Sequence, residues 1–223
     1  MKLNNKRTIL VGLAFLSICA FWQMYDSVVP LILTKTFHMN ETFSGAIMAA
    51  DNILALFLLP FFGSVSDKSH SKLGKRMPFI LFGTGCAIIL MNILPLLDNS
   101  YAAQPSGFKT ASFVIVLGLL LVAMGTYRAP AVALMPDVTP KPLRSRANAI
   151  INLMGAVGGI LYLGVAAVLY PNSKTAGLDH VNYQPLFIVV SAIMFVAVAV
   201  LFLTIREPKL TAENQALEKQ HPE

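Results

Sequence analysis

The stretch GSVSDKSHSKLGKRMPFI, residues 63–80, contains a polar and basic segment between two long apolar runs. Four of its residues are Lys or Arg, whereas the runs at 42–65 and 78–97 contain neither residue type. An apolar run of about 20 residues is long enough to cross the hydrocarbon core of a bilayer as a helix. The stretch therefore predicts a short loop that joins two membrane-spanning helices.

The composition of the whole chain also indicates a membrane protein. Of its 223 residues, 56% are hydrophobic and 13% are charged, with a mean hydropathy of +0.66. Soluble domains carry about 25% charged residues. We therefore expect an all-α membrane protein with six transmembrane helices. The predicted spans are 8–33, 42–65, 78–97, 111–135, 147–170 and 186–205.

The basic residues predict the orientation of these spans. Thirteen Lys and Arg residues lie in the two tails and in the loops after the second and fourth spans. The opposite side carries three, which are Lys35, Lys109 and Lys174. Basic residues concentrate on the cytoplasmic side of membrane proteins, so both termini are expected in the cytoplasm. The predicted organisation is a cytoplasmic tail at 1–7, a six-helix bundle at 8–205 and a cytoplasmic tail at 206–223.

The sequence contains no pattern of an enzyme, a metal site or a nucleic-acid-binding domain. Cys19 and Cys86 both lie in apolar runs, which is typical of small buried side chains. None of the four histidines stands at a metal-like spacing from a Cys or Glu. The net charge of +6 is explained by membrane orientation rather than by nucleic acid. We expect no catalytic residue, no metal and no cofactor, and the lipid bilayer as the first partner.

The loop at 63–80 resembles the signature loop of the major facilitator superfamily. In that pattern a Gly is followed four residues later by an Asp, as in Gly63 and Asp67, and then by another Gly and a basic pair. Here Gly74, Lys75 and Arg76 follow after a longer spacing than the general form has. The ending basic-basic-x-Pro-Phe-Ile resembles the sucrose–proton symporters and the glycoside–pentoside–hexuronide cation symporters.

Two further stretches carry the same resemblance. YRAPAVALMPDVTPKPLRSRANAI, residues 127–150, is similar to the sucrose-type symporters, with Arg128 in the fourth span, Asp137 at its end, and Arg146 and Asn148 leading into the fifth. IREP at 205–208 resembles the end of the sixth span in this superfamily. The resemblance implies the N-terminal six-helix bundle of a twelve-span fold, in which substrate lies between two halves. The tail at 206–223 then resembles the start of the central linker.

The resemblance also bears on the coupling ion. Melibiose-type members of the superfamily bind sodium with two aspartates in the second span. Those positions are Ala55 and Leu59 in this chain. The sodium site is therefore not expected here, and a proton is the expected coupling ion.

Three ionisable residues lie inside predicted spans: Asp26, Asp51 and Arg128. Charges at such positions usually face the bundle interior or a water-filled cavity. At 1.5 Å per residue, Asp51 lies about 15 Å from the outer end of its span and Arg128 about 13 Å from the inner end of its own. The two are similar in depth and are expected to pair. Asp26 lies in the outer half.

Arg128 is the first candidate for a substrate-binding residue. Its planar guanidinium suits two-point hydrogen bonding to sugar hydroxyls, and its charge is permanent. Either Asp51 or Asp26 would carry the proton, because desolvation and a nearby Arg shift the pKa of a carboxylate in opposite directions. The alternative is a structural ion pair that neutralises two buried charges.

Trp22 and Gln23 are the other candidates for sugar contacts. Trp22 and Asp26 share a helix face with Gln23 adjacent, and sugars commonly bind aromatic faces and amide groups. The alternative is that Trp22 belongs to the aromatic belt at the membrane interface.

The remaining candidates are assigned to gating and packing. The resemblance implies a cytoplasmic gate loop formed by Gly63, Asp67, Gly74, Lys75, Arg76, Asp137 and Arg146. Simple anchoring by basic residues is the alternative for this loop. In the fifth span, Gly155 and Gly159 form a G-x-x-x-G pattern, which allows close approach of helices, and Asn148 is expected to bond across helices.

These features together predict sugar transport by alternating access, coupled to protons, in a cell membrane and specifically a bacterial inner membrane. A single bundle supplies one wall of the cavity. The chain would then act with a second six-helix half, as a separate chain or a homodimer, or be a truncated half. The alternative is a non-transporting assembly or regulatory module with the same fold. The sugar, the direction of transport and the proton-carrying Asp stay open.

Overall fold

A computed structural model describes residues 3–220, and within that range every regular element is a helix. A π-helical turn continues the first helix, and a 3-10 turn precedes the fifth. The elements in chain order are α1 (Asn5–Leu31), η1 (Ile32–Thr36), α2 (Glu41–Asp67), α3 (Met77–Ala103), α4 (Gly107–Val138), η2 (Lys141–Leu143), α5 (Arg144–Leu169), α6 (Asn172–Thr175), α7 (Gln184–Thr204) and α8 (Glu207–Gln220).

Six helical segments of the described chain are long and apolar enough to cross a membrane. They are α1 with η1, α2, α3, α4, α5 with η2, and α7, which confirms the six predicted spans. The differences lie at the ends, where polar residues extend a helix beyond its apolar run. At the start of α1, for example, the Asn4 side chain accepts the Arg7 backbone N–H at 3.1 Å and caps the helix inside the predicted tail.

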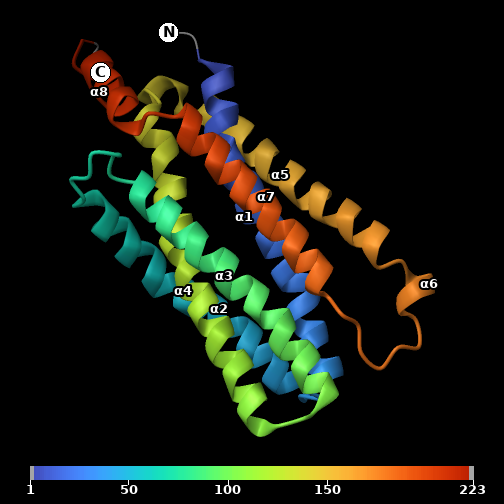
Figure 1. The fold of residues 1–223 in the computed structure, drawn as a ribbon. Coiled ribbons are helices and arrows are strands. Elements are labelled where there is room, and N and C mark those ends of the chain that lie inside the picture. Colours follow the sequence, from blue (N-terminus) through green and yellow to red (C-terminus); the bar gives the residue numbers. More distant parts are fainter. Residues whose placement is uncertain (1–2, 221–223) are drawn as a thin grey trace.

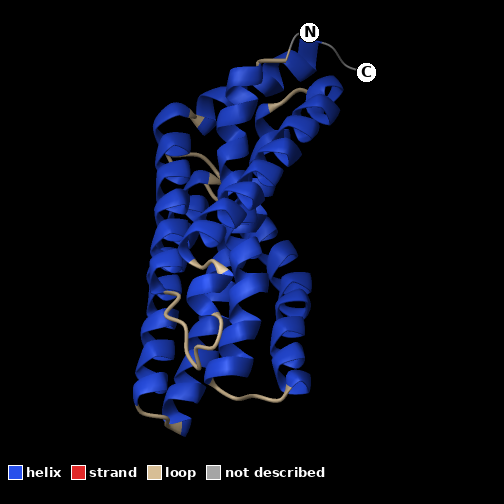
Figure 2. Cartoon of the chain, turned by 90° about the vertical axis from the view of Figure 1, so that its right-hand side faces the viewer, coloured by secondary structure: helices blue, strands red, loops and turns tan. Residues whose placement is uncertain are grey.

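The helices run side by side along one long axis (Figures 1 and 2). Helix α1 packs against α5 and α7, α3 packs against α4 and α7, and α2 lies against α4. The start of α1, the α2–α3 loop and α8 lie at one end of the bundle (Figure 1). We call this the basic end. The opposite end, which carries the α3–α4 loop and α6, is the far end.

A buried tyrosine joins α4 to α1 in the core. The Tyr127 hydroxyl lies 2.6 Å from Ser17 Oγ and donates to the Ala14 carbonyl at 3.0 Å. Tyr127 and Ser17 are both fully buried. A hydroxyl in an apolar interior needs such partners, because an unpaired polar group there costs free energy. This contact fixes α4 against α1 one residue before Arg128.

Glycines on α5 allow a close crossing with α1. A Cβ atom on Gly158 would clash with the Leu16 carbonyl. A Cβ on Gly155 would lie 2.9 Å from Cys19 Sγ, which is also too close. Gly159 lies at the side of the crossing and has room for a Cβ. The closest contact is therefore at Gly158, which the predicted Gly155–Gly159 pattern did not include.

Replacing Gly158 with alanine is expected to destabilise the bundle by about 1–3 kcal/mol, because the added methyl group overpacks the α1–α5 crossing. Gly164→Ala is the matched control, since a Cβ there meets no atom within 4 Å. The control should be neutral or stabilising, because alanine favours a helix over glycine by about 1 kcal/mol. Thermal unfolding of both variants in detergent tests the prediction. Equal melting temperatures would contradict the close crossing.

Polar side chains tie the α6–α7 segment to the far end. His180 lies 3.2 Å from Thr36 Oγ1 through Nδ1 and 2.9 Å from Asn99 Oδ1 through Nε2. Asn99 also donates to Asn182 Oδ1 at 2.9 Å. Asp98 is fully buried within electrostatic range of His180. These contacts close the bundle at the end opposite to the two tails.

Candidate functional site

Three predicted site residues from three helices meet near the middle of the bundle. Arg128 on α4, Asp51 on α2 and Trp22 on α1 line one cavity of about 20 Å³, which has room for about one water molecule. The Arg128 guanidinium carbon lies 5.6 Å from the centre of the Trp22 ring. That geometry is a cation–π contact, which stabilises a charge by about 0.5–2 kcal/mol depending on its exposure.

Arg128 and Asp51 share the cavity without forming an ion pair. Within residues 3–220 the Arg128 side chain makes no hydrogen bond and no ion pair within 4.0 Å. The Asp51 carboxylate accepts the backbone N–H of Asn52 at 2.5 Å. The predicted direct pair is therefore absent from this structure, although both charges line the same space.

The aromatic side chains beside Arg128 also hold unpaired polar groups. Trp22 packs edge-on against Phe21 and Tyr25, with each pair of ring centres 5.3 Å apart. The Trp22 Nε1 and Tyr25 Oη atoms are buried and have no hydrogen-bond partner among the described residues. Buried groups of this kind are usually paired in proteins. Trp22 faces Arg128 near the middle of the α1–η1 segment, away from the ends at which an aromatic belt would lie.

Gln23 and Asp26 lie outside this cavity. Both side chains are exposed, and a Cβ on Gly159 of α5 would lie 3.9 Å from Gln23 Oε1. Asp26 is within electrostatic range of Asp51. The structure thus brings Trp22, Asp51 and Arg128 together and places Gln23 toward α5. Roles for Gln23 and Asp26 stay predictions.

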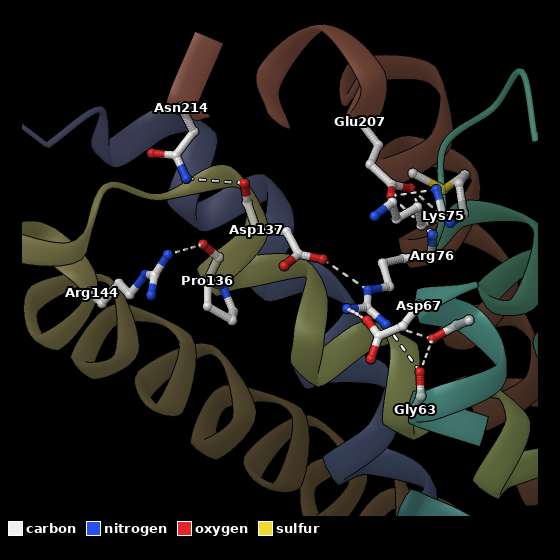
Figure 3. Close-up of polar contacts among 11 residues, drawn as sticks. Gly63, Asp67, Lys75, Arg76, Pro136, Asp137, Arg144, Glu207 and Asn214 are labelled. Carbon is white, nitrogen blue, oxygen red and sulfur yellow. Dashed lines mark hydrogen bonds and ion pairs between the residues drawn. The ribbon is translucent and has the colours of Figure 1, made fainter. Parts of the chain in front are cut away.

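A second charged cluster lies at the basic end around Arg76, which is 6% exposed (Figure 3). Its Nε donates to Asp137 Oδ2 at 2.8 Å, and its Nη2 forms a short ion pair with Asp67 Oδ1. Its Nη1 donates to Ser66 Oγ at 2.5 Å and to the Gly63 carbonyl at 3.4 Å. One guanidinium therefore links the end of α2, the start of α3 and the end of α4.

The environment of Arg76 keeps this side chain charged. Burial alone would lower its pKa, but hydrogen bonds and charge attraction from Asp137 and Asp67 outweigh burial, and the pKa is raised. Arginine is already protonated at every physiological pH. The guanidinium charge of Arg76 is therefore present at every physiological pH.

Glu207, which the sequence analysis did not single out, caps the start of α3. Its carboxylate accepts the backbone N–H groups of Lys75 at 2.7 Å, Arg76 at 2.9 Å and Met77 at 2.8 Å. Anions are favoured at helix N-termini, where backbone N–H groups lack partners. Gly74 has φ +111, and a Cβ there would clash with the Glu207 carboxylate. Glycine is therefore favoured at position 74, because another residue would be strained at this φ and would clash with Glu207.

The end of α4 is held by Arg144 and Asn214. Arg144 donates from Nε to the Thr139 carbonyl at 3.1 Å and from Nη2 to the Pro136 carbonyl at 2.9 Å. Asn214 of α8 donates to the Asp137 carbonyl at 3.1 Å (Figure 3). Arg146 is exposed and makes no side-chain hydrogen bond or ion pair with residues 3–220. A gating role for Arg146 stays a prediction.

Asn148 does not make the predicted contact across helices. It is exposed on α5, and its side chain has no hydrogen bond to the described residues. The helix turns this position away from α1, toward which Ile151 and Gly155 face as buried residues. The α1–α5 contact is therefore made by small and apolar side chains.

The fold and the two charged clusters define a multi-pass helical membrane protein with a polar centre. Residues 11–222 match the Major Facilitator Superfamily, and the chain belongs to this superfamily. This is a family of transporters, and it confirms both the predicted fold of a six-helix N-terminal half and the expectation that the chain is not an enzyme. The resemblance found in the signature loop is likewise confirmed.

Several relatives share sequence with the chain. The Sucrose transport protein SUC3 of Arabidopsis thaliana is 35% identical over 145 residues, which cover 60% of this chain and 24% of that protein. The Sucrose transport protein SUT3 of Oryza sativa subsp. indica is 36% identical over 123 residues, covering 49% and 24%. Human Solute carrier family 45 member 3 is 26% identical over 185 residues, covering 81% and 33%. The matched part is a third of each relative or less, and these plant and human proteins give no support to a bacterial inner membrane.

Proposed function

We propose that the chain forms one half of a sugar transporter that works by alternating access, with the Arg128 cavity as half of the substrate site. The observation that carries the proposal is the convergence of Arg128, Asp51 and Trp22 from three helices. A guanidinium with no hydrogen bond or ion pair to residues 3–220 and a carboxylate can bind sugar hydroxyls, and the face of Trp22 can pack against the C–H groups of a sugar ring. Charges at such depth in a bundle usually serve a substrate or ion pathway. The sucrose transport proteins among the relatives support a disaccharide as the substrate class.

A second six-helix half would complete the cavity. Helix α2 exposes large apolar side chains along most of its length, among them Leu56 and Phe57, which are 71% and 67% exposed. Helix α5 exposes Leu153 and Ile160 in the same way. Such faces contact either lipid or another bundle. The relatives are three to four times longer than their matched part, which supports a second half in the complete transporter.

The carboxylate in the cavity supports proton coupling. Asp51, Ala55 and Leu59 stand at four-residue spacing on α2 and line the same space. Two of these three positions are apolar, so a site with several carboxylate ligands for sodium is not formed by them. Asp51 is the carboxylate that lines this cavity among the described residues. We assign Asp51 as the proton carrier. We also propose that the basic end faces the cytoplasm, because basic residues concentrate on that side of membrane proteins.

Asp51→Asn tests this assignment. The variant is expected to lose sugar accumulation driven by a pH gradient in proteoliposomes, because asparagine cannot exchange a proton. It should retain sugar counterflow, which needs no net proton movement. Asp26→Asn is the matched control and should retain both activities, since Asp26 lies outside the cavity. Accumulation that follows a sodium gradient and ignores pH would contradict proton coupling.

The second candidate function is a non-transporting assembly or regulatory module. The network around Arg76 is compatible with it, because that network stabilises the fold without reference to substrate. A purified protein that stays monomeric and binds no sugar when mixed with its second half would favour this function.

A further inference from the structure

A groove of about 440 Å³ lies at the basic end, between the start of α3 and the link from α7 to α8. Its lining combines three basic residues with exposed apolar side chains. The Leu203 side chain is 77% exposed and that of Leu73 is 44% exposed, at the end of the bundle where the span α7 finishes. We call it the basic groove, and the lining residues that matter are Lys72, Arg206, Lys209, Leu73, Phe202 and Leu203.

The basic residues of this groove come from two distant segments that Glu207 holds together. The Glu207 side chain is buried against the start of α3, where it accepts the N–H groups described above. Arg206 and Lys209 flank it in sequence and are exposed. Lys72 reaches the same groove from the α2–α3 loop. The hydrogen bonds of Glu207 therefore bring together the two segments that carry the three cations.

These three cations have no acidic partner in the described structure. The ion pairs within residues 3–220 join Arg7 to Glu213 and Arg76 to Asp67 and Asp137, and none involves Lys72, Arg206 or Lys209. The nearest carboxylate in sequence, that of Glu207, is used by α3. Three unneutralised positive charges around one groove favour an anionic ligand.

We propose that the basic groove binds an anionic phospholipid from the leaflet at the basic end. The phosphate would lie among the three cations, and an acyl chain would lie along the exposed apolar side chains Phe202 and Leu203. Basic pockets at the ends of membrane helices have this specificity for anionic headgroups. The apolar wall distinguishes a lipid from a soluble phosphate, which would use only the charges. A bound lipid would bridge the α2–α3 loop and the α7–α8 link from outside and stabilise the Arg76 network.

Native mass spectrometry of the full purified chain tests the proposal, with phosphatidylglycerol and phosphatidylcholine of identical acyl chains as probes. Phosphatidylglycerol is expected to be retained in preference. Each basic residue near the headgroup contributes about fivefold to affinity, so the triple variant Lys72→Gln, Arg206→Gln, Lys209→Gln should bind phosphatidylglycerol on the order of 100-fold more weakly. The single variant Arg206→Gln should bind phosphatidylglycerol about fivefold more weakly, and it provides the test if the triple variant does not fold.

The matched control removes the same charge from the same end outside the groove, with Lys6→Gln, Lys68→Gln and Lys141→Gln, all at exposed positions. It should retain most of the phosphatidylglycerol binding. Equal loss in the two triple variants would overturn the proposal, because it would show attraction by net charge alone. Displacement of the lipid by glycerol 3-phosphate or by an acidic peptide at equal concentration would also overturn it, in favour of a soluble ligand.

Discussion

Replacing Arg128 with lysine is expected to abolish sugar binding and uptake while leaving the fold intact. The guanidinium offers a rigid, planar pair of donors, whereas the three donors of an ammonium sit on a flexible stem and are not fixed in the geometry of a two-point contact. Hydrogen bonds to a charged group contribute about 1.5–3 kcal/mol each, so the loss of two should weaken binding by at least about 100-fold. The positive charge is conserved, so the effect would report hydrogen-bonding geometry rather than electrostatics.

Trp22 provides a direct readout for this variant. It is the single tryptophan of the chain, and its ring lies against Arg128. Sugar binding in the complete transporter should change its fluorescence saturably in the wild type but not in Arg128→Lys. Arg146→Lys is the matched control, because Arg146 is exposed. Uptake at the wild-type rate by Arg128→Ala would contradict the assignment of Arg128 to the substrate site.

Arg76→Ala is expected to give the largest loss of stability. The substitution leaves Asp67, Asp137 and Ser66 without their shared partner at a buried position. The buried Ser66 hydroxyl loses a donor, whereas the Asp67 and Asp137 side chains are 61% and 31% exposed and keep access to water, so the loss is expected to be about 2–4 kcal/mol. The free energy of unfolding, measured by titrating the detergent-solubilised protein with SDS, should fall by that amount.

Lys75→Ala is the control for Arg76. The Lys75 side chain is exposed, and its contact with Glu207 is made by the backbone N–H, which alanine keeps. This variant should therefore unfold within about 0.5 kcal/mol of the wild type, as surface substitutions usually do. Similar losses in the two variants would mean that the basic end is held by general charge and not by the guanidinium contacts.

The six spans could be predicted from the sequence, and so could the grouping of Arg128 with Asp51. Six apolar runs correspond to six helices because a bilayer demands a minimum length of apolar helix, which is a local property. The loop at 63–80 was likewise readable, because its Gly–Asp–basic pattern is contiguous. The similar depth of Arg128 and Asp51 in the membrane predicted that they would lie near each other. It could not predict that a cavity separates them.

The contacts that escaped prediction depend on how helices are rotated and where they end. Glu207 caps α3 from 130 residues away, which only the packed α7–α8 link reveals. Arg144 contacts the end of α4 and Arg146 is exposed, because a helix turns its side chains by about 100° per residue. The same rotation places Gly158 at the α1–α5 crossing and turns Asn148 outward. Spacing alone could not choose between neighbouring positions on one helix.

Uptake of radiolabelled sucrose into proteoliposomes tests the central claim most directly. The chain would be reconstituted alone, as a possible homodimer, and together with a second six-helix half, under an inward proton gradient. We expect accumulation above equilibrium in at least one of these preparations, and loss of accumulation when an uncoupler collapses the gradient. The absence of both sucrose binding and uptake in both preparations would contradict a role in sugar transport. The helical content and the melting temperature of the protein would have to show that it is folded.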